Sequence, residues 1–375
     1  MAVSEASETS GRGFRFPLRI QIEPRLQTPG WLPAATSVGA LILAFIIGGV
    51  IIGLAGGDPI RSYLHIAKAA FGSVGVLNDT LVKAAPLILV GLACALAFRM
   101  RLWNIGAEGQ FYLGAWGASA VVLVPLLPKT TPAPIMLGAM AVAGFLCGAL
   151  WAWLPGYLKA RLNVNEVVTT LMMNYIAVSW TLYWVFGAWS EGGFQMSPVF
   201  PKSAWLPRLT DLAAQIDAFA GLTLHLGFLF GIAAAVIVWF IVNRSRWGYE
   251  IRLIGDNPRA ANYAGVSIVR NTVLVMMLSG GLAGLAGMAE ISGVVHRLQG
   301  AISPGYGFTG IIVAWLAKLN PFAVILVSIL FGGLILAGRE IQPSGVPRML
   351  QGIILVCVIA SDVLLRYRVR VVRDA

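Results

Sequence analysis

The sequence predicts an all-α polytopic membrane protein with about ten spanning helices, on three observations. Apolar residues make up 58% of the 375 residues and charged residues only 11%, whereas soluble domains are about 45–50% apolar and about a quarter charged. The apolar residues gather in runs of about 20, the length that crosses a bilayer. Basic residues stand at the edges of these runs, as the positive-inside rule expects.

The hydropathy pattern divides the chain into three parts. A basic cytoplasmic segment, 1–30, precedes a transmembrane domain, 31–366, and a cytoplasmic tail, 367–375. The first apolar run is too long for a signal peptide, so we expect a retained span. The ten expected spans lie near 31–54, 81–98, 104–126, 133–155, 166–188, 223–242, 271–292, 304–318, 320–338 and 347–366. The eighth and ninth are short and could instead form a re-entrant hairpin.

The distribution of basic residues predicts the threading. Most of the 27 lysines and arginines fall in segments that share one side if the N-terminus is cytoplasmic, so we expect both termini inside. They include Arg12, Arg15, Arg19, Arg25, Arg99, Arg101, Lys159, Arg161, Lys318 and the arginines of 243–270 and 366–373. The loop 189–222 is then external. Residues 58–83 are either a surface amphipathic helix, with Ile60, Leu64, Ala67 and Phe71 at helical spacing, or a plain connector.

A weak internal repeat relates residues 104–116 (NIGAEGQFYLGAW) to residues 303–315 (SPGYGFTGIIVAW). Each opens a predicted span with a glycine-broken start, and the two spans enter the membrane from opposite sides. Inverted repeats of this kind are typical of transporters and point to the translocation path. Tyr306 and Phe308 in the second copy are therefore pathway candidates.

Glu108 is the acidic residue best placed to lie within the membrane. An ionisable group there is a candidate for function. The alternative, which we favour, is a structural residue in the first turn of its helix, with Asn104 as the cap. Under either interpretation Asn104 and Gln110 could line the path.

Aromatic residues of the fifth span carry a similar ambiguity. Tyr175 and Trp180 lie deeper than the others and could stack on a flat, uncharged ligand. Aromatic residues near a helix end more often form the interfacial belt. Gly144 and Gly148 in the fourth span, and Gly280, Gly281, Gly284 and Gly287 in the seventh, predict close helix packing.

The internal loop 243–270 predicts a short helix outside the bilayer. Asp256 or Asn257 would cap it, with Pro258 at its first position and Gly265 at its end. A capped helix among basic residues is suited to docking, although an ordinary surface helix would look the same.

Other chemistry is excluded. The sequence contains no GxxxxGK[ST] motif, no GxSxG and no metal-ligand cluster, and its three cysteines and three histidines are scattered. Residues 305–310 match GxGxxG without the strand that a dinucleotide site needs. The basic residues form no single patch, so we expect no nucleic-acid partner.

Four blocks resemble the permease family of ABC importers for simple sugars and purine nucleosides, which is related to branched-chain amino-acid permeases. They are 100–110 (MRLWNIGAEGQ), 162–175 (LNVNEVVTTLMMNY), 255–265 (GDNPRAANYAG) and 303–314 (SPGYGFTGIIVA). The resemblance covers about 31–366. One departure is residues 315–318 (WLAK), where relatives usually show leucines and a glycine after Val-Ala.

This resemblance implies a multi-pass subunit of the bacterial inner membrane, the larger of a permease pair. It implies a second permease, cytoplasmic ATPases that hold ATP and magnesium, and an external substrate-binding lipoprotein. The chain itself would be non-catalytic, with no cofactor or metal. Its ATPase-coupling helix would comprise Gly255, Asp256, Asn257, Pro258, Ala260, Ala261, Tyr263 and Gly265. The expected cargo is a neutral nucleoside or simple sugar. The rival function is an ion-coupled secondary transporter, for which Glu108 is the plausible coupling group.

Overall fold

The computed structural model describes residues 18–25, 29–124, 126–128, 130–338 and 345–373. Arg12 and Arg15 of the predicted basic segment lie outside them. A helix stands at each of the ten predicted spans, namely α1 (Leu32–Leu54), α3 (Val74–Arg99), α4 (Ala107–Leu123), α5 (Ala133–Leu162), α6 (Glu166–Phe186), α7 (Gly227–Arg244), α10 (Ile268–Glu290), α11 (Tyr306–Leu316), α12 (Pro321–Ala337) and α13 (Val346–Arg366). The remaining helices are α2 (Pro59–Phe71), α8 (Arg246–Asp256), α9 (Pro258–Tyr263), the 3-10 turns Lys202–Ala204, Leu209–Leu212 and Asp217–Phe219, and the π-helical turn Ile291–Val295 that continues α10.

Length and apolar composition together separate these elements. Among the described residues, six helices are long and apolar enough to cross a membrane: α1, α3, α5, α7, α10 with its π-helical turn, and α13. The chain is thus a membrane protein with a helical embedded part, as predicted. Helix α11 has 11 residues and spans only about 16 Å. It is reached through the non-helical stretch 296–305.

Side-chain caps explain where several helices begin. Asp58 accepts hydrogen bonds from the N–H groups of Ile60 and Arg61 at the start of α2. Asn165 does the same for α6, and Asn320 for α12, whose first residue is Pro321. Each side chain satisfies N–H groups that the helix leaves without a partner.

A helix, α2, forms within 58–83, where the sequence left a surface amphipathic helix and a plain connector open. Ile60, Leu64 and Phe71 on one face are 72%, 66% and 44% exposed. On the other face Tyr63 donates a hydrogen bond to the Phe45 carbonyl oxygen of α1, at 2.6 Å. An apolar face left uncovered is typical of a helix lying at the membrane surface.

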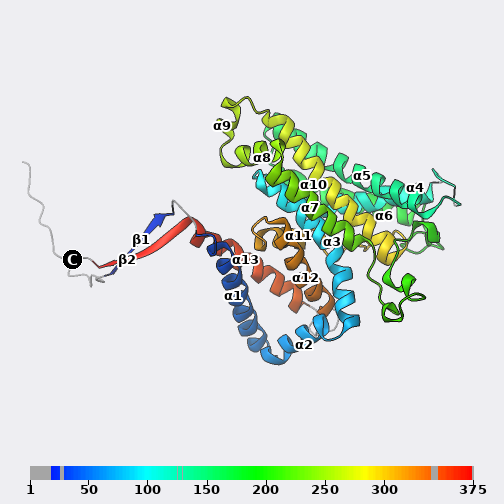
Figure 1. The fold of residues 1–375 in the computed structure, drawn as a ribbon, viewed down its shortest axis with the longest axis horizontal. Coiled ribbons are helices and arrows are strands. Elements are labelled where there is room, and N and C mark those ends of the chain that lie inside the picture. The colour runs from blue at the N-terminus through cyan, green and yellow to red at the C-terminus, as the bar shows by residue number, and fades with distance from the viewer. Residues whose placement is uncertain (1–17, 26–28, 125, 129, 339–344, 374–375) are drawn as a thin grey trace, which may run out of the picture.

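Helix α3 occupies the centre of the bundle (Figure 1), and every residue from Val82 to Phe98 is buried. Helix α10 packs beside it against α4 and α5. A Cβ on Gly284 would overlap the Gly144 carbonyl oxygen, and one on Gly148 would overlap the Gly280 carbonyl oxygen. The predicted glycine faces are therefore a real contact, in which backbone meets backbone.

The helix ends collect on two opposite faces of the molecule. One of them, called here the α9 face, holds α8, α9, the end of α3 and the α11–α12 turn. In that turn Lys318 pairs with Asp362 of α13 at 2.5 Å. The other, the loop face, holds α2 and the segment 187–226. There Phe200 N–H donates to the His296 carbonyl oxygen at 2.8 Å.

Both ends of the described chain lie on the α9 face. Strand β1 (Leu18–Pro24) pairs antiparallel with β2 (Tyr367–Arg373), with Leu18 opposite Arg373. This two-stranded sheet, which the sequence analysis did not anticipate, projects from the helices (Figure 1). The chain therefore enters and leaves the bundle on the same side.

The glycine contact leads to a stability prediction. Gly284→Ala should destabilise the protein by about 1–3 kcal/mol, because a methyl group must displace backbone atoms that cannot move separately. Thermal unfolding in detergent measures the effect. Gly138→Ala in α5 is the control, since a Cβ there meets nothing within 4 Å. Equal unfolding midpoints for the two variants would contradict the packing argument.

Candidate functional site

The two copies of the internal repeat meet at their helix starts. The Glu108 carboxylate, in the first turn of α4, accepts a hydrogen bond from the Gly307 N–H of α11 at 2.6 Å. The Ser303 hydroxyl accepts from the N–H groups of Gly305 and Tyr306, at 3.0 and 2.9 Å. A Cβ on Gly307 would overlap the Glu108 backbone. A carboxylate thus lies at the positive end of a helix from the opposite repeat.

The placement of Glu108 in the first turn agrees with the structural interpretation, but the expected cap does not form. The N-cap of α4 is Gly106. Asn104 lies two residues before it, and its side-chain oxygen accepts from the Gly106 N–H at 3.1 Å. The interaction of Glu108 with α11, which joins residues 199 positions apart, could not be read from the local pattern.

Asn104 and Gln110 satisfy one another. The Asn104 amide donates to the Gln110 side-chain oxygen at 2.8 Å and to the Ser279 hydroxyl at 2.9 Å, and the Gln110 amide donates back at 3.0 Å. Asn174 of α6 accepts from the Gly109 N–H at 2.8 Å. All three amide side chains are buried. These hydrogen bonds join α4 to α6 and α10. Buried amide groups in a membrane protein need hydrogen-bond partners within the protein, because lipid offers none.

The predicted pathway residues therefore fall into two groups. Asn104, Glu108, Gln110 and Tyr306 are buried, and the Tyr306 ring lies 5.7 Å from that of Phe111. The second group is on the surface of the chain: Tyr175, Trp180 and Phe308 are 66%, 41% and 45% exposed. The structure does not bring the two groups together as one continuous lining.

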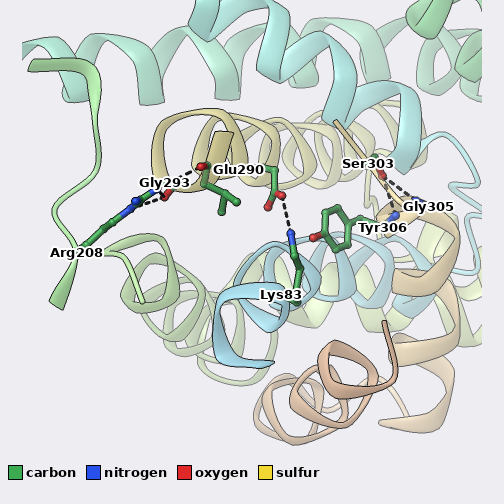
Figure 2. A network of polar contacts seen from close by, with 8 residues as sticks. Lys83, Arg208, Glu290, Gly293, Ser303, Gly305 and Tyr306 are labelled. Carbon is green, nitrogen blue, oxygen red and sulfur yellow. Dashed lines mark hydrogen bonds and ion pairs between the residues drawn. The ribbon is translucent and has the colours of Figure 1, made fainter. Parts of the chain in front are cut away.

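A buried ion pair lies near the first group, and the sequence analysis missed it. Lys83 of α3 and Glu290 at the end of α10 are 3.1 Å apart, with side chains 10% and 3% exposed. The Lys83 ammonium stands 6.0 Å over the Tyr306 ring, as Figure 2 shows. Each residue falls inside a predicted span, 81–98 or 271–292, so two opposite charges within spans were the available signal.

On the loop face, Arg208 covers the end of α10. Its guanidinium donates to the Gly293 carbonyl oxygen at 3.0 and 2.6 Å (Figure 2) and contacts the His296 ring. The Trp205 ring stacks on His296, with centroids 3.7 Å apart.

On the opposite face, α9 has the predicted form. Asn257, rather than Asp256, is its cap and accepts from the Arg259 and Ala260 N–H groups, both at 3.1 Å. Gly265 follows the helix with φ +75°. Ala261 is buried and Tyr263 is 94% exposed. The helix is thus fixed on one side and presents an aromatic ring outward.

Helix α8, which the sequence analysis did not separate from α9, anchors this region. A Cβ on Gly255 would overlap the Arg99 carbonyl oxygen, so α8 lies directly on the end of α3. The Trp247 indole donates to Asn271 of α10 at 2.6 Å, and Asn271 donates to Glu250 at 2.8 Å. Movement of α9 would therefore be passed to α3 and α10.

No group of three or more His, Cys, Asp or Glu side chains that could hold a metal ion occurs in the described ranges.

Two further ion pairs join helices. Lys159 pairs with Glu166 at 3.0 Å between α5 and α6, and Lys318 pairs with Asp362 between the α11–α12 turn and α13. Lys318 belongs to the segment 315–318, in which the sequence departs from the family pattern, and it ties the α11–α12 turn to α13.

Comparison with known proteins assigns the family. A model of branched-chain amino acid transport system permease components matches residues 76–359. The glucose ABC transporter permease protein TsgB13 of Haloferax volcanii is 35% identical over 95% of this chain and 95% of its own. The guanosine ABC transporter permease protein NupP of Bacillus subtilis is 35% identical over 88% and 93%. The nucleoside ABC transporter permease protein NupB of Lactococcus lactis is 30% identical over 82% and 84%. No solved structure matches.

The chain therefore belongs to this family of ABC transporter permease subunits, which confirms the resemblance. Permease subunits are non-catalytic, and the ATPase is a separate subunit. The same three organisms each contain a second permease that matches at lower identity: NupC at 24%, NupQ at 28% and TsgC13 at 27%.

The ion pair leads to a second stability prediction. Lys83→Met should destabilise the protein by about 3–5 kcal/mol, because it removes the ammonium that lies 3.1 Å from the buried Glu290 carboxylate. The double variant Lys83→Met/Glu290→Leu should recover most of that loss, since both charges are then removed. Thermal unfolding in detergent measures both. A double variant no more stable than Lys83→Met would argue against an electrostatic role for the pair.

Proposed function

We propose that this chain is one of two permeases in an ABC importer that carries a neutral nucleoside or simple sugar across the bacterial cytoplasmic membrane. Membership of the ABC permease family is the observation that carries the proposal. Relatives named for glucose, guanosine and nucleosides support this cargo class. The rival, an ion-coupled transporter, has no support in these relatives.

We propose ten crossings, with both termini in the cytoplasm. The presence of β1 and β2 on the α9 face supports an even number. Basic residues in 243–270 and at Arg99, Arg101 and Lys318 all belong to that face, in agreement with the positive-inside rule. The eighth crossing would consist of the stretch 296–305 together with α11. Segment 187–226 would then be external and would meet a substrate-binding lipoprotein.

The residues from Gly255 to Gly265 would form the contact with the ATPase. A fixed helix with one ring almost wholly exposed is suited to enter a groove on a partner. ATP binding would move the two ATPase subunits, α9 would follow, and α8 would pass the shift to α3 and α10. Such a rigid-body step can exchange an outward-open path for an inward-open one.

The substrate path would run along the exposed face of α6 rather than through the amide network. Tyr175 lies nine residues from the start of α6, about 14 Å along its axis. It is 66% exposed there. A phenolic hydroxyl facing lipid at mid-depth is unfavourable, so this face would meet water and a second permease. Trp180, on the same helix, would add ring surface for a flat or sugar-like solute. Phe308 of α11 is a separate exposed candidate.

The second permease would be a different protein. Each of three organisms has two permeases that match this chain, one at 30–35% identity and one at 24–28%. The chain resembles the first member of each set. ATP and magnesium would be held by the partner ATPase and no cofactor by this chain. No nucleic-acid partner is proposed.

Substitutions in α9 and at the last residue of α8 test the coupling role. Tyr263→Asp and Asp256→Arg should each lower ATP-dependent uptake at least tenfold in cells that express the whole transporter, while membrane insertion stays normal. Tyr263→Phe is the matched control, because it keeps the ring that would enter the partner. Normal uptake by both charged variants would rule out α9 as the ATPase contact.

The two groups of candidate residues can be told apart by uptake kinetics. Tyr175→Ala and Phe308→Ala should raise the KM for uptake several-fold without changing the unfolding midpoint, because both rings are largely exposed. Gln110→Ala should lower the midpoint instead, since it removes a buried hydrogen-bond partner of Asn104. An unchanged KM for both aromatic variants would place the path elsewhere.

A further inference from the structure

A small aromatic pocket lies on the α9 face, between the end of α3, the start of α4 and the end of α11. Its volume is about 240 Å³, and it is lined by Phe98, Arg101, Trp103 and Trp315. The Phe98 and Trp103 rings are 5.3 Å apart, and Phe98 and Trp315 5.8 Å. Trp103 and Trp315 stack at 5.6 Å with 29° between their planes.

The local backbone holds these groups in place. Arg101 has φ +56°, a left-handed conformation that non-glycine residues rarely adopt. Its N–H donates to the Phe98 carbonyl oxygen at 2.9 Å, and the Leu102 N–H donates to that of Ala97 at 3.1 Å. This tight turn sets Arg101 and Trp103 on the same pocket.

The arrangement differs from an interfacial belt. Belt residues direct their rings to the lipid headgroups, whereas these three rings contact one another, and Trp315 comes from a helix far from the other two in the sequence. The Arg101 side chain is exposed and Trp103 is 39% exposed, so the pocket has an open side. The Trp315 indole nitrogen is buried and has no hydrogen-bond partner within the part of the chain that the structure describes.

We infer that this pocket binds a planar heteroaromatic ring that carries hydrogen-bond acceptors or a negative charge. Aromatic side chains stack on the flat face of any base-like ring. A guanidinium at the rim binds an anionic substituent or stacks on the ring itself. The volume is just below the usual 300–1,000 Å³ of ligand sites, which limits the buried part to a single ring system. A longer substituent would leave past Arg101.

The position of the pocket gives an occupant a means to affect transport. Trp103 directly precedes Asn104 of the amide network. Arg99, next to Phe98, is covered by Gly255 of α8. A bound ring would join the ends of α3, α4 and α11 at the point where motion of α9 arrives. That the pocket opens to the cytoplasm rests on the proposed orientation, whereas binding itself does not.

Equilibrium binding to the full chain in phosphatidylcholine nanodiscs tests the inference, with guanosine monophosphate as the probe. We expect saturable binding that Trp315→Leu and Trp103→Leu each weaken about tenfold or more, and Arg101→Ala several-fold. Trp239→Leu is the control. Trp239 is also paired with a phenylalanine, Phe322 at 5.9 Å, and an arginine, Arg244 at 5.7 Å. The Trp239→Leu variant should bind the probe with the same affinity as the unaltered chain.

Three results would overturn the inference. One is the absence of saturable binding to the unaltered chain. Another is binding that survives both tryptophan variants but is lost in Tyr175→Ala, which would place the ring on the α6 face. The third is a tenfold loss of binding of uncharged guanosine in phosphatidylglycerol discs, whose charge does not repel that probe; this result would assign the pocket to a lipid headgroup. Trp103→Leu removes a partly exposed ring, so it reports on binding even if Trp315→Leu does not fold. None of these readouts requires transport, so they are independent of the uptake tests of α9.

Discussion

Helix α10 approaches α4 and α5 so closely that backbone atoms rather than side chains meet, and the rest of the bundle is arranged around this contact. A Cβ on Gly114 would overlap Gly284 itself, and one on Gly287 would overlap the Phe111 carbonyl oxygen. Lipid supplies no hydrophobic force between helices, so their association depends on such close packing and on buried polar contacts. With α4 and α5 held at this distance, the starts of α4 and α11 are brought to one place.

The polar groups of the embedded region complete that arrangement. Glu108 joins α4 to α11, the Asn104–Gln110 pair reaches Ser279 of α10, and Lys83 joins α3 to Glu290. Each group would be costly if left alone in a low-dielectric interior. Together they tie α3, α4, α10 and α11 to one another, which limits the relative movement of these helices. In the proposed function, the exposed face of α6 lines the path instead.

This rigidity suits a subunit that is moved by a partner. Helix α9 is fixed to α8, α8 lies on the end of α3, and α3 runs through the centre of the bundle (Figure 1). In the proposed function, a push at Tyr263 would reach the buried core through the contact of Gly255 with the Arg99 backbone. The aromatic pocket at Phe98 and Trp315 lies beside this route, which is why an occupant there could influence coupling.

The sequence by itself determined which segments form helices and that the long apolar ones are membrane helices. Runs of about 20 apolar residues specify membrane helices because the bilayer thickness is fixed, and Asn257 with Pro258 specifies α9 because capping is local. Spacing also predicted the glycine faces, and for 58–83 it offered an amphipathic helix as one of two interpretations. The tertiary structure alone decided which distant groups meet. Glu108 and Gly307, or Lys83 and Glu290, are about 200 residues apart, and no local pattern encodes such a pairing. The sequence also could not show that Tyr175 lies on the surface, because its exposure depends on which face of α6 the neighbouring helices leave uncovered.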